Sequence, residues 1–161
     1  MDTLVVWFSH SGHTAWAAER IGQTLGADLL PIRPVKAYPA RGAALFLAGG
    51  RSALMEEKPL LQPYEFREEK YDQVILGFPV WAGNVAPPLR SFLAENRDAL
   101  MGKRLAAFAC QSGSGAEKAF RKLSECLGAE KLRAELILTD PGKKQPDDRA
   151  AKIADFCEKC R

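Results

Sequence analysis

Three short, uninterrupted apolar runs separated by longer helical patterns constrain the fold of this chain more than any other feature. The runs occupy residues 4–8, 74–78 and 105–109. A strand that is apolar on both faces needs helices on both faces, which is typical of a parallel sheet built from βαβ units. We therefore expect these three strands to be central in a doubly wound α/β fold.

Two weaker apolar segments complete the expected sheet. Residues 29–32 include Pro31, which cannot donate a ladder hydrogen bond, and residues 132–138 are interrupted by Arg133 and Glu135. Both segments therefore suit edge strands. A doubly wound five-stranded parallel sheet in the order 2-1-3-4-5 places the second and fifth strands at its edges, so the sequence predicts this α/β fold.

The segments between the predicted strands carry helical patterns. Ala17, Ile21 and Leu25 recur every fourth residue, and Gly26 would end that helix. Residues 43–55 predict another helix, interrupted by a pair of glycines, and the prolines that follow it indicate a loop. Three more helices are expected over residues 88–96, 117–127 and 147–159.

Length, composition and charge limit the possible classes of protein. The 161 residues suit a single domain, 1–161, and 47% hydrophobic with 27% charged residues is an ordinary globular balance. No apolar run approaches the roughly 20 residues of a bilayer span, and no basic signal-peptide start precedes the first strand. A net charge of +3 is too small to indicate nucleic-acid binding. We therefore expect a cytoplasmic protein.

Three loops that follow the predicted central strands contain the candidate site. In a doubly wound sheet, ligands bind beyond the carboxyl ends of the strands, where the strand order reverses. The first loop is Ser9, His10, Ser11, Gly12, His13 and Thr14; the second is Pro79, Val80, Trp81, Ala82, Gly83 and Asn84; the third is Gln111, Ser112, Gly113, Ser114 and Gly115.

The first loop has the composition of a phosphate cradle. It joins a buried strand to a helix N-terminus, where unpaired N–H groups and the helix dipole favour an anion. Ser9, Ser11 and Thr14 add hydroxyl donors, and Gly12 lets the backbone close around a phosphate. The loop has neither the lysine of the nucleoside triphosphate loop nor the G-x-G-x-x-G spacing of a dinucleotide fold, which makes those two classes of site unlikely here.

These motifs resemble the flavodoxin-like family. The phosphate loop of that family reads S/T-x-S/T-G-x-T directly after the first strand, and here it is Ser9-x-Ser11-Gly12-x-Thr14. Gly-Phe-Pro-Val-Trp at residues 77–81 is similar to the G-x-P-x-W run of one subgroup, and a Ser-Gly-Ser-Gly loop follows the fourth strand. The resemblance covers nearly the whole chain and implies FMN as the cofactor.

The resemblance also implies a role for each loop. The first loop would hold the phosphate, with His10 and His13 supplying backbone N–H groups or flanking it. In the second loop Trp81 would lie against the isoalloxazine, with a core tryptophan as the alternative. The sequence departs from the subgroup at Ala82, where tryptophan is common, and at Asn84, where threonine is frequent.

The third loop would offer backbone donors from Gln111, Ser112 and Gly113 to the pyrimidine carbonyls, where negative charge gathers on reduction. Ser114 and Gly115 would form a turn and a helix cap. This loop lacks the aromatic residue that many small electron-carrier flavodoxins place over the flavin, so one face of the ring would be open.

Two functions remain open. The open ring face favours an FMN-dependent oxidoreductase that passes electrons from NAD(P)H or a protein donor to a small acceptor such as a quinone. The alternative is a one-electron carrier between partner proteins, with no substrate site of its own. The charge of +3 weakens that alternative, because carriers of this family are commonly acidic.

Cys157 and Cys160 form a C-x-x-C pair on the predicted last helix. Zinc would need two more ligands, and neither the other two cysteines nor the two histidines have suitable spacing. We therefore expect no metal site and reduced thiols, with Cys157 packed inward and Cys160 exposed.

Overall fold

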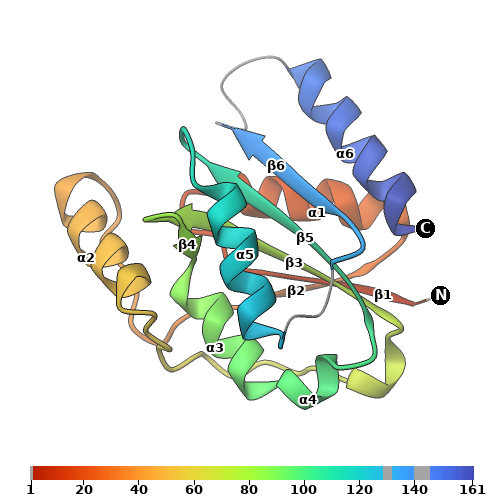
Figure 1. Ribbon diagram of the computed structural model, residues 1–161, viewed down its shortest axis with the longest axis horizontal. Helices are drawn as coiled ribbons and strands as arrows, with labels where there is room; N and C mark the ends of the chain where they lie inside the picture. The colour runs from red at the N-terminus through yellow and green to blue at the C-terminus, as the bar shows by residue number, and fades with distance from the viewer. Residues whose placement is uncertain (1, 129–131, 140–145) are drawn as a thin grey trace.

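Five parallel strands form the centre of the computed structural model, which describes residues 2–128, 132–139 and 146–161 (Figure 1). They follow the order β2-β1-β3-β5-β6, so the predicted order and the two predicted edge strands are confirmed. The strands are β1 (Thr3–Trp7), β2 (Asp28–Pro31), β3 (Gln73–Trp81), β5 (Arg104–Gln111) and β6 (Glu135–Thr139).

A sixth, very short strand, β4 (Asn84–Val85), was not predicted. It pairs antiparallel with the end of β3, with Trp81 opposite Asn84. Ala82 and Gly83 form the turn between the two strands, and their φ values of 52° and 67° have the sign that a type I′ hairpin turn requires at both positions. Because of this hairpin, β3 continues into the segment that the sequence predicted as loop.

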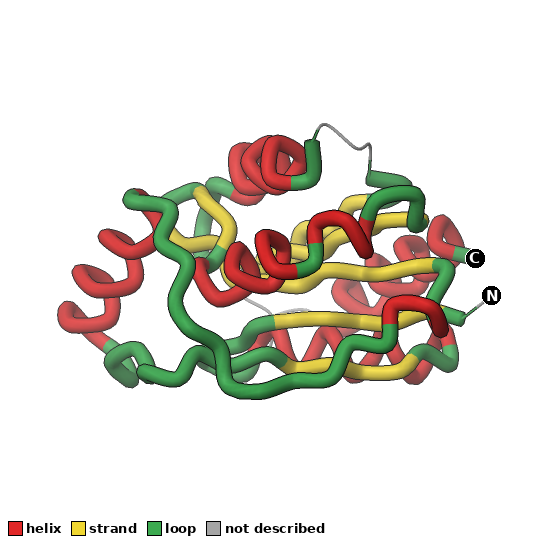
Figure 2. The backbone as a smooth tube through the Cα atoms, turned by 90° about the horizontal axis from the view of Figure 1, so that it is seen from below, coloured by secondary structure: helices red, strands yellow, loops and turns green. Residues whose placement is uncertain are grey.

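Helices cover both faces of the sheet (Figure 2). Side chains of α1 and α6 pack with one face, and side chains of α3 and α5 pack with the other. The helices are α1 (His13–Leu25), α2 (Gly42–Leu54), α3 (Pro87–Glu95), α4 (Arg97–Leu100), α5 (Ala116–Cys126) and α6 (Pro146–Cys160), with a short 3-10 helix at Glu68–Lys70.

Helix α2 differs from the other helices in its position. It lies outside the two covering layers, near the carboxyl ends of the strands (Figure 1). It runs without a break through Gly49 and Gly50, so the predicted interruption is wrong. A Cβ on Gly49 would meet the Trp81 ring, whereas a Cβ on Gly50 would face open space.

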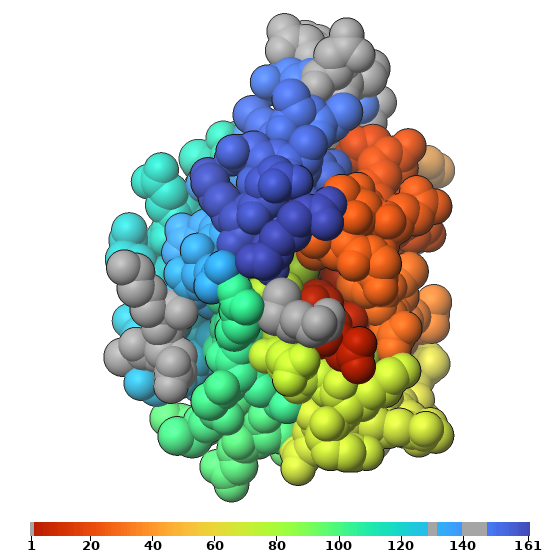
Figure 3. All heavy atoms as spheres, turned by 90° about the vertical axis from the view of Figure 1, so that its right-hand side faces the viewer, coloured from red at the N-terminus to blue at the C-terminus, as the bar shows by residue number. Residues whose placement is uncertain are grey.

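The two described ends of the chain lie at the opposite end of the molecule from α2 (Figures 1 and 3). Figure 3 shows the end of α6 in dark blue beside the start of β1 in red. The buried side chain of Gln73 joins these elements, because its Nε2 donates to Thr3 Oγ1 at 3.1 Å and to the Cys160 carbonyl at 3.0 Å.

The expected exposure of Cys160 is wrong. Ile153, Phe156, Cys157 and Cys160 recur at helical spacing on α6, and all four are buried against the same face of the sheet. Burial raises the pKa of the Cys157 and Cys160 thiols to about 11. Both thiols are therefore neutral at physiological pH.

Candidate functional site

The first predicted loop leads into the N-terminus of α1, whose first N–H groups are not capped by a side chain. Gly12 precedes the helix at φ 95°, and a Cβ at this position would meet nothing within 4 Å. The Gly12 N–H donates to Ser9 Oγ at 3.2 Å. No side chain caps the helix, and its first turn contains no acidic residue. The first N–H groups of α1 can therefore bind an anion.

Residues from all three predicted loops surround one hollow of about 270 Å³, which we call the loop hollow. The loops meet because β1, β3 and β5 are adjacent and parallel, so their carboxyl ends share one edge of the sheet. The hollow is lined by His10, Ser11, His13, Thr14, Leu45, Pro79, Val80, Trp81, Cys110, Gln111 and Ser112.

Two buried residues in the wall of the loop hollow, Thr14 and Cys110, are uncharged. Thr14 is 1% exposed and Cys110 is 6% exposed. Burial raises the pKa of the Cys110 thiol to about 11, although a hydrogen bond with the Thr14 side chain opposes this effect. Among the residues that the structure describes, no acidic side chain lines the hollow and could repel an anion there.

The Trp81 indole is packed among aromatic side chains at the loop hollow. Its ring meets Phe8, His10 and Tyr38 edge to face, with centroid distances of 5.6, 5.9 and 5.0 Å. A Cβ on Gly49 would lie 3.1 Å from Trp81 Cε3, so the backbone of α2 packs directly on the indole. Trp81 is thus held by the core and also lines the loop hollow.

A larger pocket of about 660 Å³ lies between α2 and the β3–β4 hairpin, and we call it the α2 pocket. Phe46, Gly50 and Leu54 recur every fourth residue and form one wall, and Arg51 is the one charged residue among the described residues of the lining. The other lining residues are Gly42, Leu45, Leu47, Met55, Val80, Trp81, Ala82 and Ser112.

The contribution of α2 to the site was not predicted. The spacing of Phe46, Gly50 and Leu54 is a signal for one helix face, but nothing in the sequence places that face beside Trp81. The two cavities share Leu45, Val80, Trp81 and Ser112, so they are neighbours. Together they form a site that is polar at the start of α1 and mainly apolar beside α2.

Some predicted site residues lie at the margins of these cavities. Ser9 and Gly12 line a separate hollow beside β2, on the other side of the first loop. Gly115, at φ 103°, lies so close to the hairpin that a Cβ on it would be 3.0 Å from Gly83 Cα. The second and third loops can approach this closely because Gly115 has no side chain. Gly113 lines a hollow at the start of α5.

Two side chains of the predicted site stabilise local structure. His10 Nε2 lies 3.0 Å from the Ala40 carbonyl, which joins the first loop to the segment before α2. The side chain of Gln111 accepts a hydrogen bond from the Ala116 N–H at 3.0 Å and donates to Thr139 Oγ1 at 3.1 Å. The Gln111 side chain therefore satisfies the first N–H group of α5.

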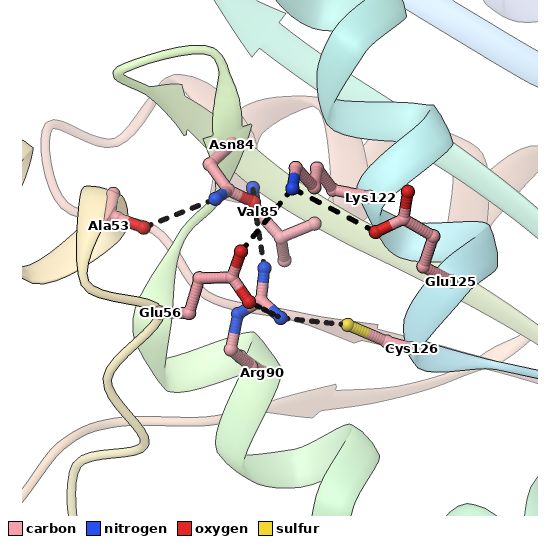
Figure 4. Close-up of polar contacts among 8 residues, drawn as sticks. All are labelled: Ala53, Glu56, Asn84, Val85, Arg90, Lys122, Glu125 and Cys126. Atoms are coloured by element: carbon pink, nitrogen blue, oxygen red, sulfur yellow. Dashed lines mark hydrogen bonds and ion pairs between the residues drawn. The ribbon is translucent and has the colours of Figure 1, made fainter.

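Asn84 lines neither the loop hollow nor the α2 pocket. Its buried side chain donates to the Ala53 carbonyl at 3.2 Å and accepts from Arg90 Nη2 at 2.7 Å (Figure 4). Arg90 Nη1 lies 3.4 Å from the Glu56 carboxylate and 3.0 Å from Cys126 Sγ. This network joins the end of α2 to β4, α3 and α5.

The part of the chain that the structure describes offers neither a metal site nor a membrane span. No cluster of His, Cys, Asp or Glu side chains there could hold a metal ion. No helix there combines the length and the apolar character that crossing a membrane requires.

Comparisons with known proteins give consistent results. The family model described as Flavodoxin matches residues 2–146, whereas no curated protein sequence matches the chain. The structure is similar to a flavoprotein from Lactobacillus acidophilus solved in complex with FMN, with a TM-score of 0.74 and 19% identity over 84% of this chain and 92% of that one.

Two further structures are similar over almost the whole chain. A flavodoxin from the domain Archaea has a TM-score of 0.60 and 18% identity, covering 99% of this chain and 98% of that one. Oxidised Flavodoxin 1 from Bacillus cereus has a TM-score of 0.58 and 18% identity, covering 99% and 96%. At these identities, the likeness shows the shared fold.

Proposed function

Since the chain belongs to the flavodoxin family, we propose that it binds one FMN non-covalently and transfers electrons through it. One observation carries this proposal: the loop hollow at the N-terminus of α1 adjoins the apolar α2 pocket. Such a site suits an elongated molecule with an anion at one end and a flat ring at the other. FMN has that form.

The first loop would hold the phosphate. The N–H groups at the start of α1 and the hydroxyls of Ser11 and Thr14 would face the phosphate, and no acidic residue of the described ranges lines the loop hollow. The open space at Gly12 fits close approach of a phosphate to the backbone.

The ring would lie beside Trp81, where both cavities meet. The three edge-to-face contacts of Trp81 fix the indole before a ligand arrives, which lowers the ordering cost of binding. Backbone donors of Ser112 and Gly113 would face the pyrimidine side. FMN, when bound, supplies the redox chemistry, and the chain supplies binding, orientation and the electrostatic environment.

The favoured activity is that of an oxidoreductase, with electrons passing from NAD(P)H or a protein donor to a small acceptor such as a quinone. The size and apolar lining of the α2 pocket support a site for a second molecule, because pockets for small molecules typically measure about 300–1,000 Å³. The four cysteines are free thiols, which supports a reducing compartment such as the cytoplasm.

A one-electron carrier remains the second candidate, and the exposed apolar side chains of α2 favour it. A carrier needs only a docking surface for protein partners next to the cofactor.

The cofactor is tested by the absorbance of freshly purified protein. We expect the blue and near-ultraviolet bands of a flavin, with the released compound identified as FMN by mass. FMN-free protein that does not bind FMN at micromolar concentrations would contradict the proposal.

The activity is tested by adding NADH or NADPH to the FMN-loaded protein without oxygen. Bleaching of the flavin bands within seconds, followed by steady turnover with a quinone, would support the oxidoreductase. If neither nicotinamide bleaches the bands, while one-electron reduction by dithionite proceeds in separate steps, the carrier is the correct assignment.

A further inference from the structure

A directed chain of hydrogen bonds starts at the hydroxyl of Tyr38, one of the residues around Trp81. The phenol oxygen lies 2.8 Å from Ser52 Oγ on α2, and Ser52 Oγ donates to Glu57 Oε2 at 3.1 Å. A serine hydroxyl has a single hydrogen, and here the carboxylate receives it. Ser52 must therefore accept its other bond from Tyr38, so both hydrogens point from Tyr38 toward Glu57.

This chain runs from the interior to the surface. Tyr38 is half-buried, Ser52 is 4% exposed and Glu57 is exposed. Burial raises the pKa of the Tyr38 phenol, and the charge of Glu57 adds to that effect, although the bond with Ser52 opposes it. The phenol therefore keeps its proton at physiological pH, and both hydrogen bonds are short enough for proton transfer along the chain.

The ring of Tyr38 contacts the candidate site through Trp81. The two rings meet edge to face, with their centroids 5.0 Å apart. Trp81 lines both the loop hollow and the α2 pocket, whereas Tyr38 is not among the described residues that line either cavity. The indole therefore lies between Tyr38 and the site.

The other two tyrosines lack this combination. Tyr64 and Tyr71 also donate to carboxylates, those of Glu95 and Asp28. Among the ring contacts of the described residues, however, neither of them meets a tryptophan. Within the described ranges, Tyr38 is thus the one tyrosine that joins a tryptophan of the site to a surface carboxylate.

We propose that Tyr38 is a redox-active residue, which returns an electron to Trp81 after the indole has been oxidised and passes its own proton through Ser52 to Glu57. The oxidant is the light-excited flavin, so the proposal rests on the proposed function above. The transfer protects the site, because it moves the oxidation from the indole that lines both cavities to a phenol behind it.

Electrons and protons balance in this sequence. One electron leaves the Trp81 indole for the excited flavin, and one electron from the Tyr38 phenol then refills the indole. The phenol O–H bond breaks as its proton goes to Ser52 Oγ, while the former Ser52 proton forms an O–H bond on Glu57 Oε2. Trp81 is restored, Tyr38 is left as a neutral tyrosyl radical and Glu57 as a neutral acid. A soluble reductant such as ascorbate then returns the electron, and the proton comes back from Glu57.

The first test uses the full-length FMN-free protein, so it does not depend on the cofactor. Azide radicals made by pulse radiolysis oxidise tryptophan, and absorbance then follows the tryptophan and tyrosyl radicals separately. We expect the tyrosyl band to grow as the tryptophan band decays. Tyr38→Phe keeps a ring against Trp81 and should lose this growth. The control Tyr71→Phe also removes a hydroxyl bonded to a carboxylate and should keep it.

A surface variant separates proton transfer from packing. Glu57→Gln keeps an oxygen that accepts from Ser52 but removes the proton acceptor, so the tyrosyl radical should form about a hundredfold more slowly. Glu69→Gln makes the same change in charge at an exposed position of the 3-10 helix and should leave the rate unchanged. An unchanged rate in Glu57→Gln would assign the chain a purely structural role and overturn the proposal.

Blue light on the FMN-loaded protein tests the protective role. Tyr38→Phe should lose Trp81 to photo-oxidation faster than the unaltered protein, as measured by mass spectrometry of its peptides. Equal loss, or no growth of the tyrosyl band in the FMN-free protein, would overturn the proposal. Growth of that band in a protein that binds no FMN would support the Tyr38 step and contradict the proposed function instead.

Discussion

The two adjacent glycines of α2 should respond oppositely to the same substitution. Neither has a positive φ, so alanine fits the backbone at both positions, and glycine inside a helix is about 0.8–1.0 kcal/mol less favourable than alanine. A Cβ on Gly50 would meet nothing within 4 Å. Gly50→Ala should therefore stabilise the protein by about 1 kcal/mol, or roughly 2–4 °C in Tm for a chain of this size.

Gly49→Ala makes the same gain in helix propensity but adds a steric cost. Its Cβ would lie 3.1 Å from Trp81 Cε3 and 3.2 Å from Cζ3. Overpacking of this kind costs about 1–3 kcal/mol, because Phe8, His10 and Tyr38 surround the indole and resist its displacement. The net change should lie between about zero and a loss of 2 kcal/mol.

Urea unfolding of the FMN-free variants, followed by far-ultraviolet circular dichroism, measures both free energies without depending on Trp81 fluorescence. Equal m-values would show that the variants unfold the same amount of surface. A second titration with FMN present should show weaker FMN binding only for Gly49→Ala, because only that variant moves the indole. Equal stabilisation by the two substitutions would refute the packing of α2 on Trp81.

The remaining predictions concern the site and the thiols. Thr14→Val should weaken FMN about tenfold to a hundredfold and riboflavin far less, with Thr14→Ser retaining affinity; an equal loss for both ligands would place the hydroxyl away from the phosphate. FMN should quench tryptophan fluorescence, and Trp81→Ala should remove most of that change; unaltered quenching would leave Trp81 a packing role only. Ala82→Gly should raise the free energy of unfolding by about 0.5–1 kcal/mol, because φ 52° strains alanine, and a lower Tm would contradict this. Cys157 and Cys160 should alkylate much more slowly at about pH 8 in the folded protein than in urea, because burial raises their pKa to about 11; equal rates by mass spectrometry would argue against their burial.

The fold could be predicted because its signals are local. Continuous apolar runs identified β1, β3 and β5 as central, and Pro31 identified β2 as an edge strand. Parallel strands bring their carboxyl ends to one edge, so strand order was enough to predict that the three loops meet. The composition of the first loop predicted an anion site that the uncapped start of α1 fits.

What the sequence could not indicate depends on contacts between distant segments. The side chain of Asn84 donates to the Ala53 carbonyl, 31 positions earlier in the chain. Cys160 was expected to be exposed, but it lies on the helix face that α6 packs against the sheet. Loop and chain-end positions alone do not indicate such partners.

The sequence by itself determined the order of the strands, the two edges of the sheet and the position of the first loop before α1, because each follows from the residue pattern of short segments. Only the tertiary structure decided that α2 forms the apolar wall of the site. The glycine pair and the side chains of α2 have a functional meaning only beside Trp81, which lies more than 25 residues away in the sequence. Packing between segments so far apart depends on the whole fold, so the sequence pattern of α2 could indicate a helix but not what that helix faces.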